Sequence, residues 1–292
     1  MELLRFDGPL DETLVEPVMV VALDGWTDAG RCGSLAAETL QAQWHAQVVA
    51  SFDGDALYDY RDRRPILSID RGILGEPTWP SLDVFHLHAG ADNDVLLVQG
   101  GEPDFAWQQL CADIVELATH TGAQRYVGLG AVPAPVPHTR PTRLATTGSD
   151  EELLDRFGRP HERLTVPASC QVIIEAALRD AGLRTLGLWA RIPHYVAGEY
   201  PAGALALLDE LATVIASGLD LSELRADADA HRQRLDLAAG SSDEISSHIQ
   251  QLETAYDADV EAEATFGPLP SGDEIAAEFE QFLRRQSEPD DH

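Results

Sequence analysis

The chain has 292 residues, enough to bury a full core in one large α/β domain with an appendage. It carries 50 acidic residues against 20 basic ones, for a formal net charge of −30, and every basic residue is arginine. Binding to phosphate backbones or anionic membranes depends on clustered cations, so neither nucleic acid nor a membrane surface is an expected partner. The absence of lysine also excludes a phosphate-loop lysine, a Schiff-base lysine and a lysine-activated serine.

Three cysteines stand far apart in the chain, at Cys32, Cys111 and Cys170. An odd number without CxxC spacing predicts a reduced compartment, with neither a disulfide framework nor a structural zinc site. The first residues lack a basic segment followed by an apolar core, and no apolar run reaches the ~20 residues that a bilayer requires. We therefore expect a cytoplasmic protein without a signal peptide.

Apolar runs alternate with helical patterns over the first 216 residues. The first run, Val18–Leu23, is continuous and β-branched, which predicts a strand buried on both faces. The further predicted strands are Val48–Phe52, Ile66–Ile69, Val84–Leu87, Val95–Val98, Tyr126–Val132 and Leu186–Ile192, and the predicted helices are Ser34–Gln43, Phe105–Thr119, a short helix behind a Ser149/Glu152 capping box, Pro167–Ala181 and Ala202–Ala216. This alternation predicts an α/β fold in which helices cover both faces of a mostly parallel sheet.

After Gly218 the pattern is helical only and strongly acidic. Residues 205–292 hold 21 acidic residues against 5 arginines, which is over half of the excess negative charge. The predicted helices are Leu221–Leu237, Asp243–Glu263 behind a Ser241/Glu244 capping box, and Asp273–Arg285. The middle one of these carries an apolar stripe, which must pack on the α/β domain or on a neighbouring subunit, formed by Ile245, Ile249, Leu252 and Tyr256. The predicted division is residues 1–217 for the α/β domain, 218–286 for an acidic helical appendage and 287–292 for a disordered tail.

Two of the predicted strands end alike. Gly128–His138 and Gly187–His194 are each an apolar run that stops at proline and then presents a histidine. In α/β sheets, ligands bind in the crevice at the carboxyl ends of parallel strands. We therefore expect four side chains to lie at neighbouring strand ends in that crevice, namely His138, Arg140, His194 and Tyr195.

Two interpretations of these four residues stay open. Converging imidazoles and a guanidinium can bind a carboxylate or phosphate, or supply general acid–base catalysis. Alternatively, each imidazole satisfies loop carbonyls and Arg140 pairs with one of the many acids.

The loop Asp24–Gly30 also has two interpretations. It joins a strand to a helix and could hold an anion, yet Asp28 is equally suited to capping that helix. Asp28 and Gly30 are therefore also candidate ligand-binding residues.

Two further motifs have weaker chemical interpretations. Cys170 is predicted in the first turn of a helix, where the dipole lowers a thiol pKa, so a Cys–His hydrolase is one alternative and a buried structural cysteine the other.

His86 and His88 lie two residues apart within a predicted strand, so both side chains point to the same face. A metal site would need a third ligand, such as Asp28 or Glu102. We expect no metal and no cofactor.

Four segments in order resemble the PAC2 family, which is named after a proteasome assembly chaperone. They are Gly25–Gly30, Gly101–Trp107, Gly130–Pro141 and Ile192–Ala197, and the resemblance spans roughly residues 15 to 215. It implies a Rossmann-like sandwich, similar to the phosphorylase/hydrolase-like folds, and oligomeric assembly. The family's chaperones dock to proteasome subunits through a C-terminal hydrophobic–Tyr–any tail. This chain ends in Asp290-Asp291-His292, so docking to the proteasome by that route is not expected.

The leading hypothesis is a homo-oligomer that acts through protein–protein contact, in an assembly-chaperone-like or scaffold role with a possible protein client. The alternative is a hydrolase, transferase or small-ligand binder that uses the strand-end crevice on an anionic metabolite. The two differ in what His138 and His194 do: replacing them abolishes ligand binding in the enzyme or binder case and lowers stability if their role is structural.

Overall fold

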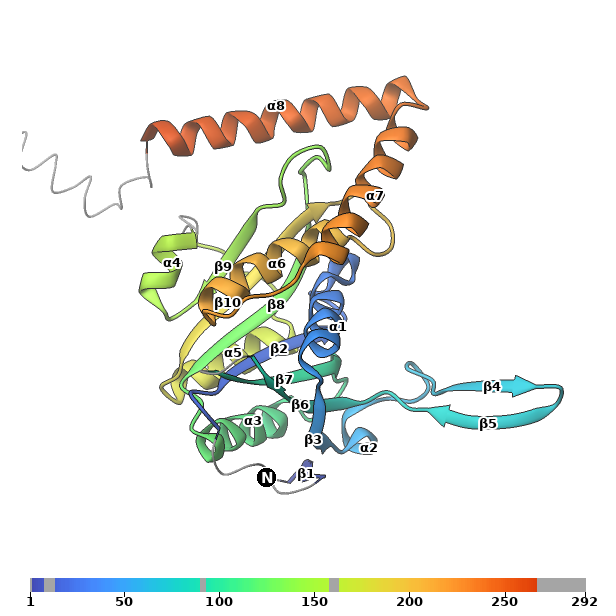
Figure 1. The fold of residues 1–292 in the computed structure, drawn as a ribbon, viewed down its shortest axis with the longest axis vertical. Coiled ribbons are helices and arrows are strands. Elements are labelled where there is room, and N and C mark those ends of the chain that lie inside the picture. The colour runs from blue at the N-terminus through green and yellow to red at the C-terminus, as the bar shows by residue number, and fades with distance from the viewer. Residues whose placement is uncertain (1, 8–13, 90–92, 158–162, 267–292) are drawn as a thin grey trace, which may run out of the picture.

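The computed structural model describes residues 2–7, 14–89, 93–157 and 163–266 (Figure 1). Its centre is one sheet of eight strands in the order β1-β3-β6-β7-β2-β8-β10-β9, and β4 and β5 form a separate pair. The strands are β1 Leu4–Phe6, β2 Val18–Asp24, β3 Gln47–Phe52, β4 Ile66–Asp70, β5 Ile73–Thr78, β6 Leu82–His88, β7 Asp94–Gly101, β8 Arg125–Ala134, β9 Leu144–Gly148 and β10 Arg184–Pro193. The helices are α1 Cys32–Trp44, α2 Gly54–Leu57, α3 Trp107–Thr121, α4 Glu151–Phe157, α5 Cys170–Asp180, α6 Pro201–Val214, α7 Ser222–Ala239 and α8 Asp243–Phe266.

The predicted α/β fold class is confirmed, with a parallel centre and antiparallel flanks. Strands β7, β2, β8 and β10 pair in parallel, while β1, β3 and β6 on one side and β9 on the other pair antiparallel. The connection from β6 to β7 is only residues 89–93, and such a short link permits an antiparallel pair but no parallel crossover. The parallel strands all end at one edge, which is where the sequence places the candidate site.

Two hydrophobic cores lie on opposite faces of this sheet. In β2, Val18, Val20 and Ala22 face the layer that contains α1 and α6, whereas the residues between them face the layer of α3 and α5. This explains the unbroken apolar run, because a strand covered on both faces has no solvent side on which to alternate.

The predicted helical appendage is present as α7 and α8. Leu221 and Leu224, at the start of α7, belong to the core cluster that includes β2 and α6. Helix α8 crosses the molecule above the loop between β8 and β9, and its Ile249 and Leu252 are buried (Figure 1). Ile249 and Leu252 of the stripe therefore pack within the same chain, whereas Ile245 is 47% exposed. The predicted helix 273–285 and tail 287–292 lie outside the described residues.

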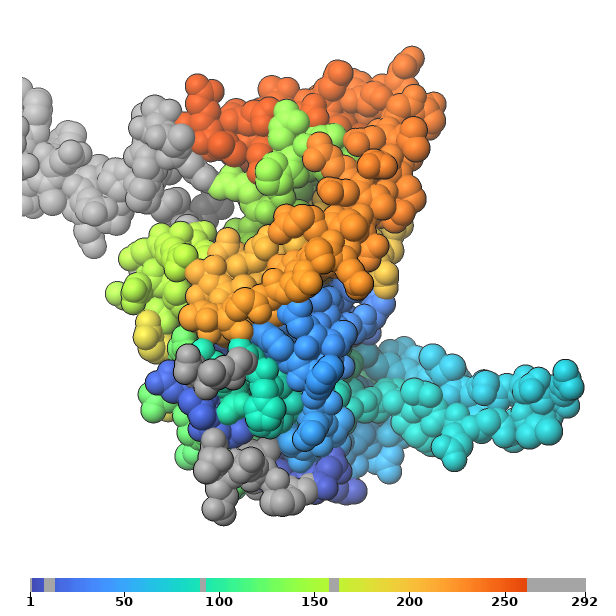
Figure 2. All heavy atoms as spheres, in the orientation of Figure 1, coloured from blue at the N-terminus to red at the C-terminus, as the bar shows by residue number. Residues whose placement is uncertain are grey.

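A β-hairpin of β4 and β5 projects from the body of the molecule (Figures 1 and 2). Its turn is Arg71-Gly72, and both residues have positive φ, 49° and 83°. These are the backbone angles of the tight turns that suit twisted hairpins, and glycine favours them. Within the described residues, no helix is both long enough and apolar enough to cross a bilayer.

Candidate functional site

The carboxyl ends of β8 and β10 lie side by side. Ala134 pairs with Pro193 at the last register position, and the backbone N–H of His194 donates to the Ala134 carbonyl at 3.2 Å. The two chain segments that follow therefore begin at the same edge of the sheet. They bring His138, His194 and Tyr195 into one aromatic group, in which the Tyr195 ring lies 5.8 Å from the His138 ring and 5.5 Å from the His194 ring.

His138 is buried, and both of its ring nitrogens have partners. The Tyr195 hydroxyl accepts the backbone N–H of His138 at 2.8 Å and lies 2.7 Å from its Nδ1, so that hydroxyl donates its own proton to Nδ1. Nε2 then carries the imidazole proton and donates to Asp236 Oδ1 of α7 at 3.2 Å. Burial lowers the pKa of His138 and outweighs the opposite effect of Asp236. The imidazole is thus neutral and fully hydrogen-bonded.

Arg140 is paired with two carboxylates of α8. Its Nε and Nη2 donate to the two oxygens of Asp257 at 2.8 and 2.7 Å, and Nη1 donates to Glu253 at 3.2 Å. These contacts raise the pKa of Arg140, with the Asp257 hydrogen bonds as the largest cause. A bidentate pair of this kind is the geometry with which arginine would hold a carboxylate or phosphate ligand. An anion at this place would have to displace the appendage.

The appendage makes further contacts at the same edge. His248 of α8 packs its ring against His194 and Tyr195, with centroids 5.6 and 6.4 Å apart. The Tyr256 hydroxyl donates to the Pro141 carbonyl at 3.0 Å, and Thr139 donates to Glu253. An acidic helix of the same chain therefore binds the polar groups at this edge, while His194 and His248 stay exposed. Ligand binding by His138, Arg140, His194 and Tyr195 remains a prediction.

Asp28 and Gly30 occupy the loop between β2 and α1. The Asp28 carboxylate accepts the Gly33 N–H at 2.7 Å and the Ser34 hydroxyl at 2.5 Å, so it holds the first turn of α1 as a helix cap would. Burial raises the pKa of Asp28 despite these hydrogen bonds. Gly30 has φ of 63°, and a Cβ there would lie 2.8 Å from Tyr200 Cβ. Asp28 therefore stabilises the start of α1, and Gly30 permits the close packing of this loop on Tyr200.

Cys170 does not have the environment of a reactive thiol. The expected lowering of its pKa at the start of α5 is wrong: burial raises the thiol pKa, and the charge of Glu102 would raise it further. The N–H that begins this helix donates to Glu102 Oε1 at 2.7 Å, so the carboxylate already occupies the helix terminus. The Cys–His hydrolase alternative therefore loses its nucleophile.

Two features were not predicted from the sequence. One is Asp94, which lies opposite His88 in the β6–β7 pair and within 2.9 Å of both His86 and His88. The short distance along the chain between His88 and Asp94 was the available signal, because it favours a hairpin that brings them together. The other is the β4–β5 hairpin, whose exposed apolar residues have the sequence pattern of an ordinary buried strand.

Comparisons with known proteins agree with this fold. A model of the PAC2 family matches residues 22–239. A protein of unknown function from Corynebacterium glutamicum is 30% identical with a TM-score of 0.84, over 89% of this chain and 99% of that one. A PAC2 family protein from Streptomyces avermitilis is 33% identical with a TM-score of 0.73, over 80% and 99% of the two chains.

A third similar structure is the proteasome-assembly chaperone homologue Rv2125 of Mycobacterium tuberculosis. It is 29% identical with a TM-score of 0.74, over 80% of this chain and 99% of that one. No curated protein matches the chain.

Proposed function

Because the chain belongs to the PAC2 family, we propose that it is a homo-oligomer that acts through protein–protein contact, in an assembly-chaperone-like or scaffold role. The likeness to a proteasome-assembly chaperone homologue supports the chaperone-like part of this proposal. The pairing of Arg140 and His138 with carboxylates of the same chain also supports it, because these two candidate ligand-binding residues already have partners. A protein client is proposed on the same grounds.

The observation that carries the proposal is the β4–β5 hairpin. Its aliphatic side chains Ile66, Ile69, Ile73 and Leu74 are between 65% and 75% exposed, and Leu67 is also exposed. A two-stranded hairpin alone is marginally stable in water, and a contiguous apolar surface on a soluble chain marks an interaction site. Figure 2 shows the hairpin standing clear of the other described residues in that view. Its apolar surface therefore needs a cover that the described residues do not supply.

We propose that another copy of this chain is that cover, and charge favours it. Residues 61–79, the hairpin with its flanks, hold four arginines against three acidic residues, whereas the whole chain has a net charge of −30. The hairpin is thus a region of this acidic protein that can approach another copy without strong repulsion. Aromatic anchors are also available close by. Trp79 directly follows β5 and packs on Tyr60 while half exposed, and Phe105, whose N–H donates to the Leu57 carbonyl, is exposed as well.

The test is the mass of the protein in solution, measured by size exclusion with light scattering over a range of concentrations. We expect the natural chain to exceed the monomer mass, and the triple variant Ile66→Ser, Ile69→Ser, Ile73→Ser to be a monomer with an unchanged circular dichroism spectrum. The matched control replaces three equally exposed aliphatic residues elsewhere, Leu164→Ser, Val166→Ser and Leu237→Ser, and should keep the natural mass. A monomeric natural chain, or a triple variant of natural mass, would contradict the proposal.

A further inference from the structure

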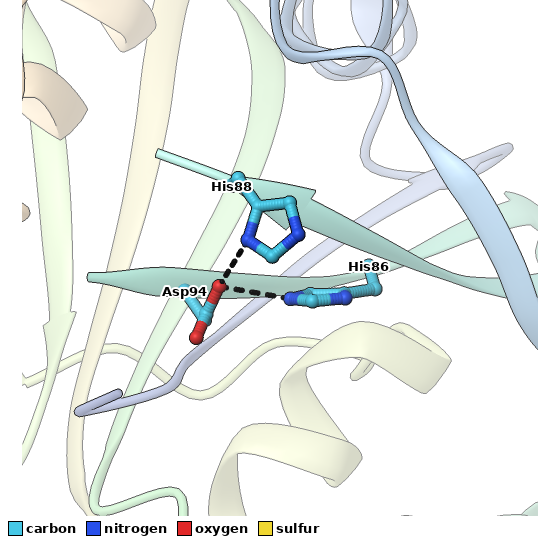
Figure 3. A group of neighbouring side chains, drawn as sticks. All are labelled: His86, His88 and Asp94. Carbon is cyan, nitrogen blue, oxygen red and sulfur yellow. Dashed lines mark hydrogen bonds and ion pairs between the residues drawn. The ribbon is translucent and has the colours of Figure 1, made fainter. Parts of the chain in front are cut away.

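Another histidine group lies at the opposite edge of the sheet from the strand-end crevice. His86 and His88 are on one face of β6, and Asp94 is the first residue of β7 (Figure 3). Asp94 Oδ1 lies 2.9 Å from His86 Nε2 and 2.9 Å from His88 Nδ1. All three side chains therefore converge on one point, with one candidate ligand atom each within 4.8 Å of the others.

We propose that His86, His88 and Asp94 bind a divalent transition-metal ion, with Zn²⁺ as the best fit. Two imidazole nitrogens and one carboxylate oxygen are the donor set that zinc and its neighbours Fe²⁺, Co²⁺ and Ni²⁺ take in proteins. Ligand atoms at roughly 2.0–2.2 Å from a tetrahedral zinc ion lie about 3.3–3.6 Å apart. The two nitrogen–oxygen separations in this group are 2.9 Å, so the atoms of each pair have to move apart by about half an ångström to admit the ion.

The chain holds the carboxylate in the orientation that such a site requires. The other Asp94 oxygen, Oδ2, accepts the Val15 N–H at 2.7 Å, and the Asp94 N–H donates to the Val15 carbonyl at 2.9 Å. Partners of this kind fix a ligating side chain and are part of most metal sites. Asp94 is the acidic residue of the group, and its Oδ1 is turned toward both imidazoles while Oδ2 is held by Val15. The group therefore offers a negative charge to a cation.

The exposure of the group indicates an open coordination sphere. The side chain of His88 is 76% exposed, whereas those of His86 and Asp94 are below 10%. Two ligands are thus held within the protein and the third stands at the surface, so water can complete the coordination from the solvent side. Metal binding requires that the ring nitrogen facing Asp94 carries no proton. On binding, that N–H proton therefore moves to the other ring nitrogen, or leaves to solvent where the other nitrogen already carries one.

Metal binding by the full chain tests this proposal, and Co²⁺ is the direct probe because its visible absorption reports the ligands. After treatment with a chelator, the natural chain should bind about one Co²⁺, which Zn²⁺ displaces. His88→Ala removes an exposed ligand without disturbing the core, and Asp94→Asn keeps the shape of the carboxylate. Loss of a residue that only supports a metal ligand weakens metal binding by roughly 10- to 100-fold. Each of these two variants loses a ligand itself, so its Co²⁺ affinity should fall by at least that factor. His120→Ala, which removes an exposed histidine of α3, should bind as the natural chain does.

The melting temperature separates a metal site from a purely structural hydrogen-bonded group. Saturating Zn²⁺ should raise the melting temperature of the natural chain and of His120→Ala, because it binds the folded state, and should leave that of His88→Ala unchanged. Absence of Co²⁺ binding to the natural chain would overturn the proposal. Equal affinity of the natural chain and His88→Ala would overturn it too, even if Asp94→Asn failed to fold.

Discussion

The carboxyl ends of β8 and β10 and the β4–β5 hairpin differ in what covers their side chains. At the strand ends, polar groups from far apart in the chain satisfy one another: Tyr195 and Asp236 bind His138, and α8 carboxylates bind Arg140. On the hairpin, aliphatic side chains point into water and no described part of the chain packs on them. The strand ends have the sequence pattern of a functional site, yet His138 and Arg140 are paired within the chain. The hairpin has the sequence pattern of a core strand, yet its side chains require a partner.

This contrast indicates where substitutions should act. If the strand-end residues have structural tasks, replacing them lowers the free energy of unfolding. If the hairpin serves association, replacing its residues changes mass in solution and leaves that free energy almost unchanged.

The largest loss is expected for His138→Ala. The change leaves a void in a buried place and removes the hydrogen bonds to Tyr195 and Asp236, which together should lower the free energy of unfolding by about 3–4 kcal/mol. Urea denaturation measures it. The control His120→Ala, at an exposed site, should stay within about 0.5 kcal/mol of the natural chain. A loss below that limit for His138→Ala would favour a ligand-binding role instead.

Glu175→Gln should stabilise the protein at alkaline pH. Burial raises the pKa of Glu175 to about 7, and the Thr147 hydroxyl at 2.9 Å and the charge of Arg179 offset this effect only in part. The folded chain therefore binds a proton more tightly than the unfolded chain, so stability is lost as pH rises from about 4.5 through 7.

A shift of this size corresponds to about 3 kcal/mol at pH 8, which Glu175→Gln should recover, with little gain at pH 5. Denaturation at the two pH values measures the difference. The exposed hairpin carboxyl gives the matched variant, Glu76→Gln, which should change stability by less than about 0.5 kcal/mol at either pH. Equal effects of Glu175→Gln at pH 5 and pH 8 would refute the assignment.

Asp28→Ala should cost about 1–2 kcal/mol, because it removes the acceptor for the first turn of α1. Asp28→Asn keeps an acceptor oxygen and should retain most of the stability, since burial already disfavours the charged form of Asp28. Thermal denaturation of the two variants side by side provides the measurement. Equal losses in both would mean that the charge, rather than the acceptor, is needed.

The smallest global effect is expected for Arg140→Glu. Three acidic groups would then face one another, and α8 should detach from the strand ends while the melting temperature of the α/β domain stays unchanged. Hydrogen exchange should become faster in α8 and remain slow in β8. Arg61→Glu, which breaks a pair with Asp59 near the hairpin, is the control and should leave α8 protected. Unchanged exchange in α8 for Arg140→Glu would show that apolar packing alone holds it.

Periodicity was sufficient to find the buried elements. Val18–Leu23 lies between two helical layers. Because both of its faces are buried, all of its residues are apolar, and this continuous run is visible in the sequence. The strands that were missed are β1, β5 and β9, which lie at sheet edges or outside the main sheet. Edge strands such as β9, with two threonines and a glycine, bury few side chains and so leave a weak apolar pattern.

The predicted helix starts fall within three residues of the observed ones, and the largest difference is at α5, which begins at Cys170 rather than at Pro167. Ser149 and Ser241 were predicted as caps, but Asp150 caps α4 and Ser242 caps α8, through bonds to the Leu153 and Ile245 N–H groups. The hydroxyl of Ser149 is held instead by Thr185 across the sheet, a contact that no local pattern can reveal.

The sequence placed the candidate site residues correctly at neighbouring strand ends, but the structure gives them partners that the sequence did not indicate. Proline followed by histidine correctly indicated neighbouring strand ends, because parallel strands end together. The sequence could not reveal that Asp236, Glu253 and Asp257 return to those ends from about 100 residues away. For His86 and His88, the alternation within β6 was visible, but the third group depended on the pairing of β6 with β7.

The three buried cysteines can report how often the helical layers of the protein open. Burial raises the pKa of Cys32, Cys111 and Cys170, so each thiol is unreactive until its helix leaves the sheet. Cys32 belongs to the core on one face, and the other two belong to the core on the opposite face. The rates at which a disulfide reagent modifies them therefore report the separate breathing of the two layers. Equal rates at all three positions would mean that the sheet and its helices open only as one cooperative unit.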